Sequence, residues 1–401
     1  MRARTNQPPN IVLLIESSRA SGRSLLRGIS EYARHHGPWA FHWEPGGFAN
    51  VSRRIDLLQA DGIILRDMEG IEEVLRFRIP VIVVGHRRRE VPGLSNVITD
   101  SRMTARLAAE HLIDCGFREF AFVGYDGTPW SDERRDAFAE CLRQAGFALR
   151  LYPPPGARGE NPEPVYEEKA APWAQEQAAI ANWLKELPAP VGIMACNDDR
   201  AQNVVEACKV AGLRVPDQVG IIGADNDELV CELADPPLSS VAINFERAGF
   251  ESARLLHQLL RHPRQSRANN ILVEPTHVVP RQSTDLLFID DLAVSRAVRF
   301  IRQNAARLVN VAEVVAAAGL SRRVLEKRFR TAVGRTILSE IRKARVDQIS
   351  RMLVDTNQSI SEIALATGFP GVEHFARYFR QERKTTPLAY RKTFGRLSIP
   401  R

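Results

Sequence analysis

The chain has 401 residues, which is enough for two or three domains that each bury a core. Its composition, 44% hydrophobic and 26% charged, is ordinary for a globular protein, and no apolar run approaches the ~20 residues that cross a bilayer. The net charge of +7 is unevenly spread, because residues 286–401 hold 22 Lys and Arg against 10 Asp and Glu. Residues 1–285 hold 33 against 38. This asymmetry favours a polyanion-binding C-terminal module, with a solvated basic surface as the alternative.

The five cysteines are scattered along the chain, at Cys115, Cys141, Cys196, Cys208 and Cys231. They form no CxxC pair and no Cys/His zinc spacing, so we expect free thiols in a reducing cytoplasm and no metal site. The first apolar run stops at Glu16, which predicts a buried strand rather than a signal peptide. We expect residues 1–9 to be a disordered N-terminal segment. We also expect a cytoplasmic protein that does not bind to or span a membrane.

Short apolar strands alternate with helical stretches through residues 10–285. The strands are expected at 11–15, 39–43, 62–66, 80–85, 119–125, 191–197 and 219–225. Strand and helix repeated in this way predict parallel sheets with helices on both faces. The series restarts after a helix expected at 101–115, so the sequence predicts two α/β lobes in tandem.

Polar side chains follow the expected strands. They include Glu16, Arg19, Arg66, Asp67, Asp100, Tyr125, Asp126, Asn197, Asp198, Asp199, Asp225 and Asn226. Open α/β sheets bind ligands beyond the carboxyl ends of their strands, and carboxylates with amides suit a neutral polyhydroxyl ligand. Arg134 could add several donors and Trp130 a flat face for a sugar ring. For any one of these residues, helix N-capping is the alternative.

The stretch ISEIALATGFPGVEHFARYFR, residues 360–380, has the pattern of a helix-turn-helix. Apolar residues fit one face of a first helix, Gly368 suits the turn, and a second helix begins after Pro370. The stretch at 311–329 repeats this pattern, at an offset of 49 residues before the turn and 50 after it. One such motif is weak evidence, but two in register, each with a basic second helix, favour DNA binding. A helix expected at 336–354, about 28 Å long, would hold the two recognition helices roughly one DNA turn apart.

The second helix of each motif would supply the base contacts. The expected base-reading residues are Arg322, Arg323, Glu326 and Lys327 in the first motif, and Val372, Glu373, His374 and Arg377 in the second. Their side chains can pair with guanine, accept from cytosine or lie against a thymine methyl. The expected phosphate contacts are Arg328, Arg380, Lys384 and Arg391. For each basic residue, a solvated helix face is the alternative.

The chain resembles two known families. DNDELVCELADPPLSSVAINFERAGFESARLL at 225–256, together with NVITDSRMTARLAAEHLIDCGFREFAFVG and ACNDDRA, resembles the LacI-type effector domain, a relative of periplasmic sugar-binding proteins. The last 110 residues or so, with GFPGVEHFARYFRQERKTTPLAYRK, resemble the AraC family. The first resemblance implies discontinuous lobes, with chain crossings near 116, 240 and 270. It also implies ligand contacts from Arg134, Asp225 and Asp198, beside which Asn226, Trp130 and Glu16 are further candidates.

Two positions depart from the AraC pattern. Val315 occupies the small-residue position of the first helix-turn-helix, which suggests a looser helix crossing there. Lys384 stands where a glycine usually precedes the Thr-Pro pair of the closing motif. Neither departure removes the expectation of DNA binding.

The combination of domains implies a sugar-responsive, sequence-specific transcription regulator, and specifically an activator of xylose or other pentose catabolism genes. Its expected partners are double-stranded DNA, a sugar effector, a second copy of the chain in a homodimer, and RNA polymerase. GxxxxGK[ST], GxSxG, HExxH and a strand-linked GxGxxG are missing, so we expect neither an enzyme nor a cofactor. The alternatives are a regulator that responds to a different sugar, and a sugar sensor that acts mainly through a protein partner.

Overall fold

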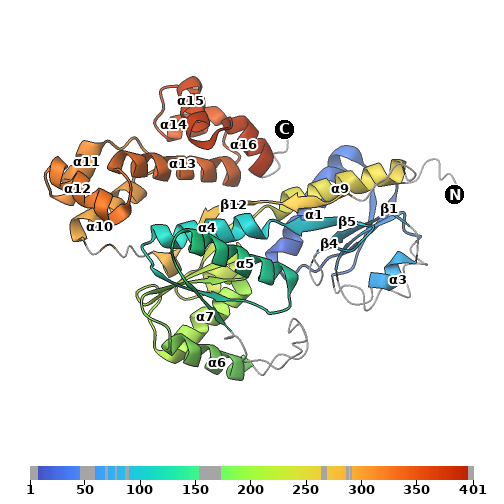
Figure 1. Cartoon of the computed structure of the whole chain (residues 1–401). Helices are drawn as coiled ribbons and strands as arrows, with labels where there is room; N and C mark the ends of the chain where they lie inside the picture. The colour runs from blue at the N-terminus through green and yellow to red at the C-terminus, as the bar shows by residue number, and fades with distance from the viewer. Residues whose placement is uncertain are drawn as a thin grey trace. The chain divides into compact units, whose positions relative to one another are not determined.

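The computed structural model describes residues 8–45, 59–67, 71–76, 79–85, 90–152, 173–262, 269–285, 289 and 291–395 (Figure 1). The chain forms two compact units, one of residues 1–109 with 119–283 and one of residues 110–118 with 284–401. Most of the expected disordered N-terminal segment, residues 1–7, lies outside the described residues. The domain boundaries expected at 9/10 and 285/286 stay predictions.

The first unit contains a six-stranded sheet in the order β11-β5-β4-β3-β1-β2. Its strands are β1 (Asn10–Leu14), β2 (Ala40–Trp43), β3 (Gly62–Arg66), β4 (Val81–Val84), β5 (Ser95–Thr99) and β11 (Ile271–Val273). All of its strand pairs are parallel. Every residue of β3 and β4 is buried, because helices cover both faces of such a sheet.

A second six-stranded sheet in this unit has the order β12-β10-β9-β8-β6-β7. Its strands are β6 (Glu119–Val123), β7 (Leu149–Tyr152), β8 (Val191–Ala195), β9 (Val219–Asp225), β10 (Ser239–Ile243) and β12 (Pro275–Val279). The edge strand β12 pairs antiparallel with β10, so the expected all-parallel pairing holds for the other strands only. The chain passes from one sheet to the other after β5, after β10 and after β11, which makes both lobes discontinuous.

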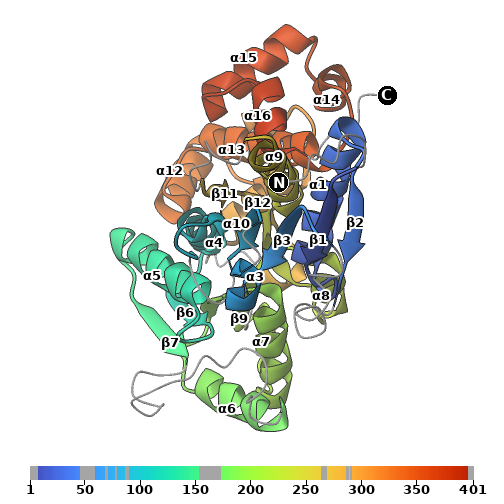
Figure 2. The same ribbon diagram turned by 90° about the vertical axis from the view of Figure 1, so that its right-hand side faces the viewer.

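The helices of this part of the chain are α1 (Ala20–His36), α3 (Ile71–Leu75), α4 (Ser101–Asp114), α5 (Pro129–Gln144), α6 (Trp173–Lys185), α7 (Asp198–Ala211), α8 (Glu228–Leu233) and α9 (Phe245–Arg261). α1 and α9 lie side by side (Figure 2). Their contact depends on two glycines: a Cβ on Gly28 would meet the Glu246 carbonyl oxygen at 1.9 Å, and one on Gly249 would meet that of Leu25 at 2.0 Å. A larger residue at either position would push the two helices apart.

The second unit is helical. It contains α10 (Leu292–Gln303), α11 (Val311–Ala318), α12 (Arg322–Val333), α13 (Ile337–Asp355), α14 (Ile360–Ala366), α15 (Val372–Arg383) and α16 (Pro387–Phe394). One buried cluster lies around Phe329 and another around Phe375 and Phe379. The first half of α13 packs in the first cluster through Ile341, and its second half packs in the other through Ile349. Among the described residues, none of the helices has the length and apolar character of a membrane span.

Candidate functional sites

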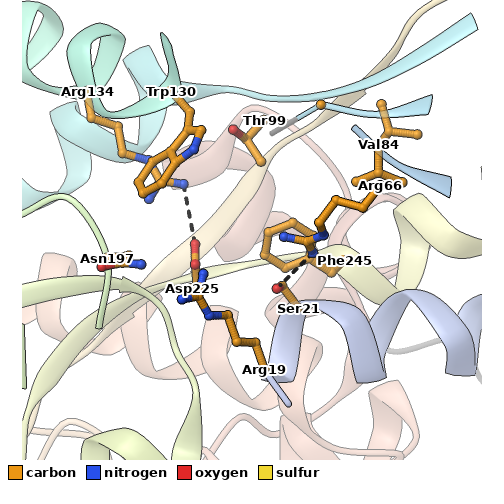
Figure 3. A pocket seen from close by; sticks show the side chains of 12 residues that line it. Arg19, Ser21, Arg66, Val84, Thr99, Trp130, Arg134, Asn197, Asp225 and Phe245 are labelled. Carbon is orange, nitrogen blue, oxygen red and sulfur yellow. Dashed lines mark hydrogen bonds and ion pairs between the residues drawn. The ribbon is translucent and has the colours of Figure 1, made fainter. Parts of the chain in front are cut away.

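A pocket of about 50 Å³ lies at the carboxyl ends of the strands in the first unit (Figure 3). It is lined by Arg19, Ser21, Arg66, Val84, Gly85, Val97, Thr99, Trp130, Arg134, Asn197, Asp225 and Phe245. Arg66 ends β3, Thr99 ends β5 and Asp225 ends β9, so both sheets contribute to the pocket. The parallel topology therefore brings together side chains that are far apart in the sequence.

Three of the predicted ligand residues meet on one side of this pocket. Arg134 is 2% exposed. Its Nη2 lies 3.3 Å from Oδ1 of Asp225, and its Nη1 donates to the carbonyl oxygen of Cys196. The guanidinium carbon lies 5.2 Å from the ring centroid of Trp130. Burial raises the pKa of Asp225, and the charge of Arg134 opposes that rise. The arrangement offers paired donors and acceptors beside a flat aromatic face, which suits sugar hydroxyls.

Asp198, also a predicted ligand residue, is engaged within the protein. Its Oδ2 accepts from the backbone N–H of Asp227 at 2.7 Å, and its Oδ1 accepts from the Ser240 hydroxyl at 2.5 Å. Burial and then the charge of Asp225 raise the pKa of Asp198 well above its usual range. The residue lines a smaller neighbouring pocket rather than the main one. Its contacts therefore hold the loop after β9 in position.

Two further candidates also lie outside the lining of the main pocket. The Oδ1 atom of Asn226 accepts from Nη2 of Arg281 at 2.9 Å. Glu16 forms an ion pair of 3.2 Å with Nε of Arg66. Glu16 therefore acts on the pocket through Arg66, which does line it.

Several residues that line the pocket are not among the predicted ligand contacts. Arg19, Arg66 and Asn197 were noted only as polar residues after strands, and Ser21 and Thr99 were not singled out. Phe245 begins α9 directly after the chain leaves β10, and nothing in its residue type indicates that it lines a pocket. Arg66 and Asn197 were expected among the polar residues that follow strands, but that position alone does not show which side chains face the pocket.

The predicted internal repeat is present in the second unit. The two turns are formed by Gly319 at φ +71° and Gly368 at φ +75°, the left-handed conformation that glycine adopts without strain. The first helix of each motif begins with a capping box, Asn310 with Glu313 and Ser359 with Glu362. The two motifs thus share the capping box at the N-terminus of their first helix and the glycine of their turn.

The recognition helices α12 and α15 each bury two residues, and the predicted base-reading residues of both helices lie on the side that is exposed. Leu325 and Phe329 are buried in α12, as are Phe375 and Phe379 in α15. All eight predicted base-reading residues are exposed: Arg322, Arg323, Glu326, Lys327, Val372, Glu373, His374 and Arg377. An exposed face of this composition can reach base edges in a major groove.

The four predicted phosphate contacts differ in their exposure and in the contacts that their side chains make within the protein. Arg380 is exposed. Arg328 forms a surface ion pair with Asp291, with 3.3 Å between its Nη1 and the Oδ2 of Asp291. Arg391 is half-buried and its Nε donates to the Leu353 carbonyl oxygen at 3.1 Å. Lys384 is exposed and holds a left-handed conformation, with φ +59°.

A polar cleft between two α/β sheets and two helix-turn-helix motifs on the same chain define a sugar-responsive, DNA-binding transcription regulator. Residues 109–284 match the periplasmic binding protein-like domain, and residues 314–393 match a helix-turn-helix domain. The chain belongs to the family of the xylose operon regulatory proteins. It is 32% identical over 390 residues to the one from Escherichia coli K12, a match that covers 95% of this chain and 96% of that protein.

Two further comparisons support this assignment. The chain is 31% identical to the xylose operon regulatory protein of Haemophilus influenzae, over 96% of this chain and 99% of that protein. The solved structure of the xylose-binding transcription activator xylR is 30% identical, with a TM-score of 0.59, and the match covers 98% of this chain and 99% of that one. The two resemblances stated from the sequence are thereby confirmed, and these relatives are transcription regulators rather than enzymes.

Proposed function

We propose that the protein responds to xylose or a related pentose bound in the main pocket and activates genes for the use of that sugar. The Arg134–Asp225 pair beside Trp130 carries this proposal, because it offers donors, acceptors and an aromatic face within one small pocket. The names of the relatives from Escherichia coli and Haemophilus influenzae make xylose the first sugar to test. The pocket residues have no catalytic role in this proposal.

Sugar binding controls DNA binding by shifting a conformational equilibrium. The effector must bind a closed arrangement of the two lobes more tightly than an open one, since equal affinity for both would shift nothing. Two chains in a homodimer would present four recognition helices to paired sites, and a bound dimer would contact RNA polymerase. The protein would do this in the cytoplasm, where it meets its DNA.

A thermal-shift panel of pentoses and hexoses tests the sugar response. Ligand at ~100 times its dissociation constant adds about 2.7 kcal/mol of stability, which is a clear shift. We expect a shift with xylose that Asp225→Asn abolishes. Asp217→Asn is the matched control, because Asp217 is exposed and paired with Arg214 at the surface. A shift with a hexose and none with any pentose would contradict the proposed effector.

A gel shift across a range of salt concentrations tests the DNA side. Binding through phosphate contacts predicts a linear fall of log K with log salt. We expect such a slope, and a change in affinity when the effector is added. If no genomic fragment is bound at any salt concentration, the protein is better described as a sensor that acts through a protein partner.

A further inference from the structure

Asp227 joins the two lobes of the first unit beside the main pocket. It lies two residues after Asp225, in the loop that follows β9 of the second sheet. Its Oδ2 accepts from the backbone N–H of Ala20 at 2.7 Å, at the start of the helix α1 that follows β1 of the first sheet. Its Oδ1 accepts from Nη2 of Arg23 at 3.3 Å. Each of these contacts joins a group of one lobe to a group of the other.

The backbone N–H of Ala20 has no partner within its own helix. Ala20 is the first residue of α1, and the N–H groups of the first turn of a helix face no carbonyl of that helix. The side chain of the N-cap residue, Arg19, makes no capping hydrogen bond. Asp227 supplies the acceptor from the other lobe, and its negative charge lies at the positive end of the helix dipole. Asp227 therefore caps α1 only when the two lobes are together.

The guanidinium of Arg23 is held in position for its contact with Asp227. Its Nη1 donates to the carbonyl oxygens of Ser17 at 2.9 Å and of Ser18 at 2.7 Å, in the turn between β1 and α1. The side chain of Asp227 is 10% exposed and that of Arg23 is 31% exposed. Because the pair is partly shielded from water, we expect it to contribute more than a fully exposed ion pair does.

The second lobe fixes the Asp227 carboxylate through an irregular turn. Asp225 and Asn226 both have positive φ, +100° and +53°, which is uncommon for residues that carry a side chain. Two hydrogen bonds hold this turn. The backbone N–H of Asn226 donates to Oγ of Ser240 at 3.0 Å, and that of Asp227 donates to Oδ2 of Asp198 at 2.7 Å. The same turn thus places Asp225 in the main pocket and Asp227 against the other lobe.

The contact between the lobes also positions residues that line the main pocket. Arg19 and Ser21 flank Ala20 in the sequence, and both line the pocket from the first lobe (Figure 3). Asp225 lines it from the second lobe. When Asp227 holds Ala20, side chains of both lobes therefore lie within reach of one small ligand.

We propose that Asp227 is a positioning residue for sugar binding, which stabilises the closed arrangement of the two lobes by capping α1 across the cleft. The inference rests on the proposed function of the main pocket. Asp227 is not among the residues that line that pocket. It acts on the population of the closed arrangement and not on any one hydroxyl of the sugar. It therefore raises the affinity for every sugar that the pocket binds by the same factor.

Ala20→Pro tests the hydrogen bond without altering Asp227. Proline lacks the donor N–H, and the first position of a helix is where proline is favoured. The extended backbone of Arg19, with φ −104° and ψ 151°, is the conformation that a following proline needs. We therefore expect α1 to form as before. The affinities for D-xylose, L-arabinose and D-ribose should fall together by roughly 10-fold or more, the effect of losing one hydrogen bond to a charged group.

Two further variants test the charges, and isothermal titration calorimetry of the full-length chain measures the affinities in all of them. Asp227→Asn keeps an acceptor for Ala20 but removes the negative charge, and Arg23→Met removes the positive one. Each should lower all three affinities by one common factor of about 2 to 10. Glu228→Gln is the matched control, because Glu228 is the next residue and is exposed. It should change no affinity.

Hydrogen exchange at the Ala20 amide, read at single-residue resolution, tests the contact without any sugar. Because this amide has no partner in its own helix, its protection depends on Asp227 and reports the closed fraction. We expect the amide to be protected in the unaltered protein and to exchange several-fold faster in Arg23→Met. Glu228→Gln should match the unaltered protein.

The outcomes separate this proposal from the pentose response. The role of Asp227 is overturned if the Ala20 amide of the unaltered protein exchanges as fast as an unstructured amide. It is also overturned if sugars bind and Ala20→Pro leaves their affinities unchanged. Affinities that fall by unequal factors in Asp227→Asn would make Asp227 a sugar contact and overturn the positioning role. If no sugar binds while Arg23→Met speeds exchange at Ala20, the pentose response is overturned and the closure by Asp227 is supported.

Discussion

Arg345 donates its Nη2 to the carbonyl oxygen of Thr367 at 2.7 Å, and its guanidinium carbon lies 3.9 Å from the ring centroid of Phe369. Arg296, which precedes Arg345 by 49 residues in the sequence, donates its Nη2 to the carbonyl oxygen of Ala318 at 3.1 Å. Each arginine comes from the helix before a helix-turn-helix and binds a carbonyl where the first helix of that motif ends. The internal repeat therefore also includes α10 and α13.

Arg345→Met should destabilise the second helix-turn-helix. Arg345 is 6% exposed. Its loss removes a hydrogen bond from a charged donor to a buried carbonyl and a cation–π contact, with an expected cost of about 2 kcal/mol. Arg296→Met is the matched variant, and because Arg296 is exposed its cost should stay below about 1 kcal/mol. Hydrogen exchange measures the local free energy of opening, at the amides of α14 and α15 for Arg345→Met and at those of α11 and α12 for Arg296→Met. Equal losses in the two variants would contradict this account.

Lys384→Gly should stabilise the second unit. Lys384 has φ +59°, while its counterpart in the first motif is Gly334 at φ +76°. The left-handed conformation costs an ordinary residue roughly 1 kcal/mol, and glycine removes that cost. Hydrogen exchange at the amides of α15 and α16 across a series of urea concentrations would measure the gain. Gly334→Lys should have the opposite sign, and a loss of stability in Lys384→Gly would contradict the strain.

Lys384→Gly has a second expected effect, on DNA binding. If Lys384 contacts a phosphate, the slope of log K against log salt should decrease by about 1 for every sequence tested. The two readouts are independent, because one concerns the free energy of unfolding and the other the counterions released from DNA. An unchanged slope would remove Lys384 from the phosphate contacts.

Arg377→Ala and Arg380→Ala should have different effects on DNA binding, since the first should change specificity and the second should change affinity alone. Arg377 lies on the exposed face of α15 that is expected to meet base edges, so its loss should cost about 1–3 kcal/mol at one base position and relax specificity there. Arg380→Ala should weaken binding to all sequences alike. Selection from a randomised DNA library, followed by affinity measurements on the selected sites, separates these effects. Uniform weakening by both variants would place Arg377 on the phosphates.

The second unit should lose stability in acid through His111. Burial, and next the charge of Arg302, lower the pKa of His111 from 6.5 to about 3. Its Nε2 lies 2.8 Å from the Thr284 hydroxyl. Between pH 6.5 and pH 3 the unfolded chain binds a proton at this residue and the folded chain does not, so stability falls as the pH falls through that window. Denaturation measured across this range should show the fall, and His111→Gln should reduce it. A slope that His111→Gln leaves unchanged would assign it to other groups.

The features that could be predicted from the sequence are those that depend on the local pattern of residues. Asp225 was predicted because it ends a strand of a parallel sheet and matches a position of a known family, and Arg134, which lies in α5, because it matches another such position. Gly319 and Gly368 were found because few residues other than glycine suit a left-handed turn. Arg66 was passed over as a contact because a strand-end arginine has the same appearance whether it faces solvent or a pocket. Arg345 was missed because helical periodicity assigns a charged residue to the exposed face, and only tertiary packing places it over Phe369.

The helix α13, with 19 residues, contributes to the buried clusters of both helix-turn-helix motifs. We expect the length of this single helix, about 28 Å at ~1.5 Å per residue, to set the distance between the two DNA grooves that the motifs can contact together. Because α13 packs in the clusters of both motifs, we expect the protein to adapt poorly to a changed distance between the two DNA sites that its motifs would contact. An operator lengthened by five base pairs between them would turn the second groove to the far side of the duplex, and only one motif could then stay bound.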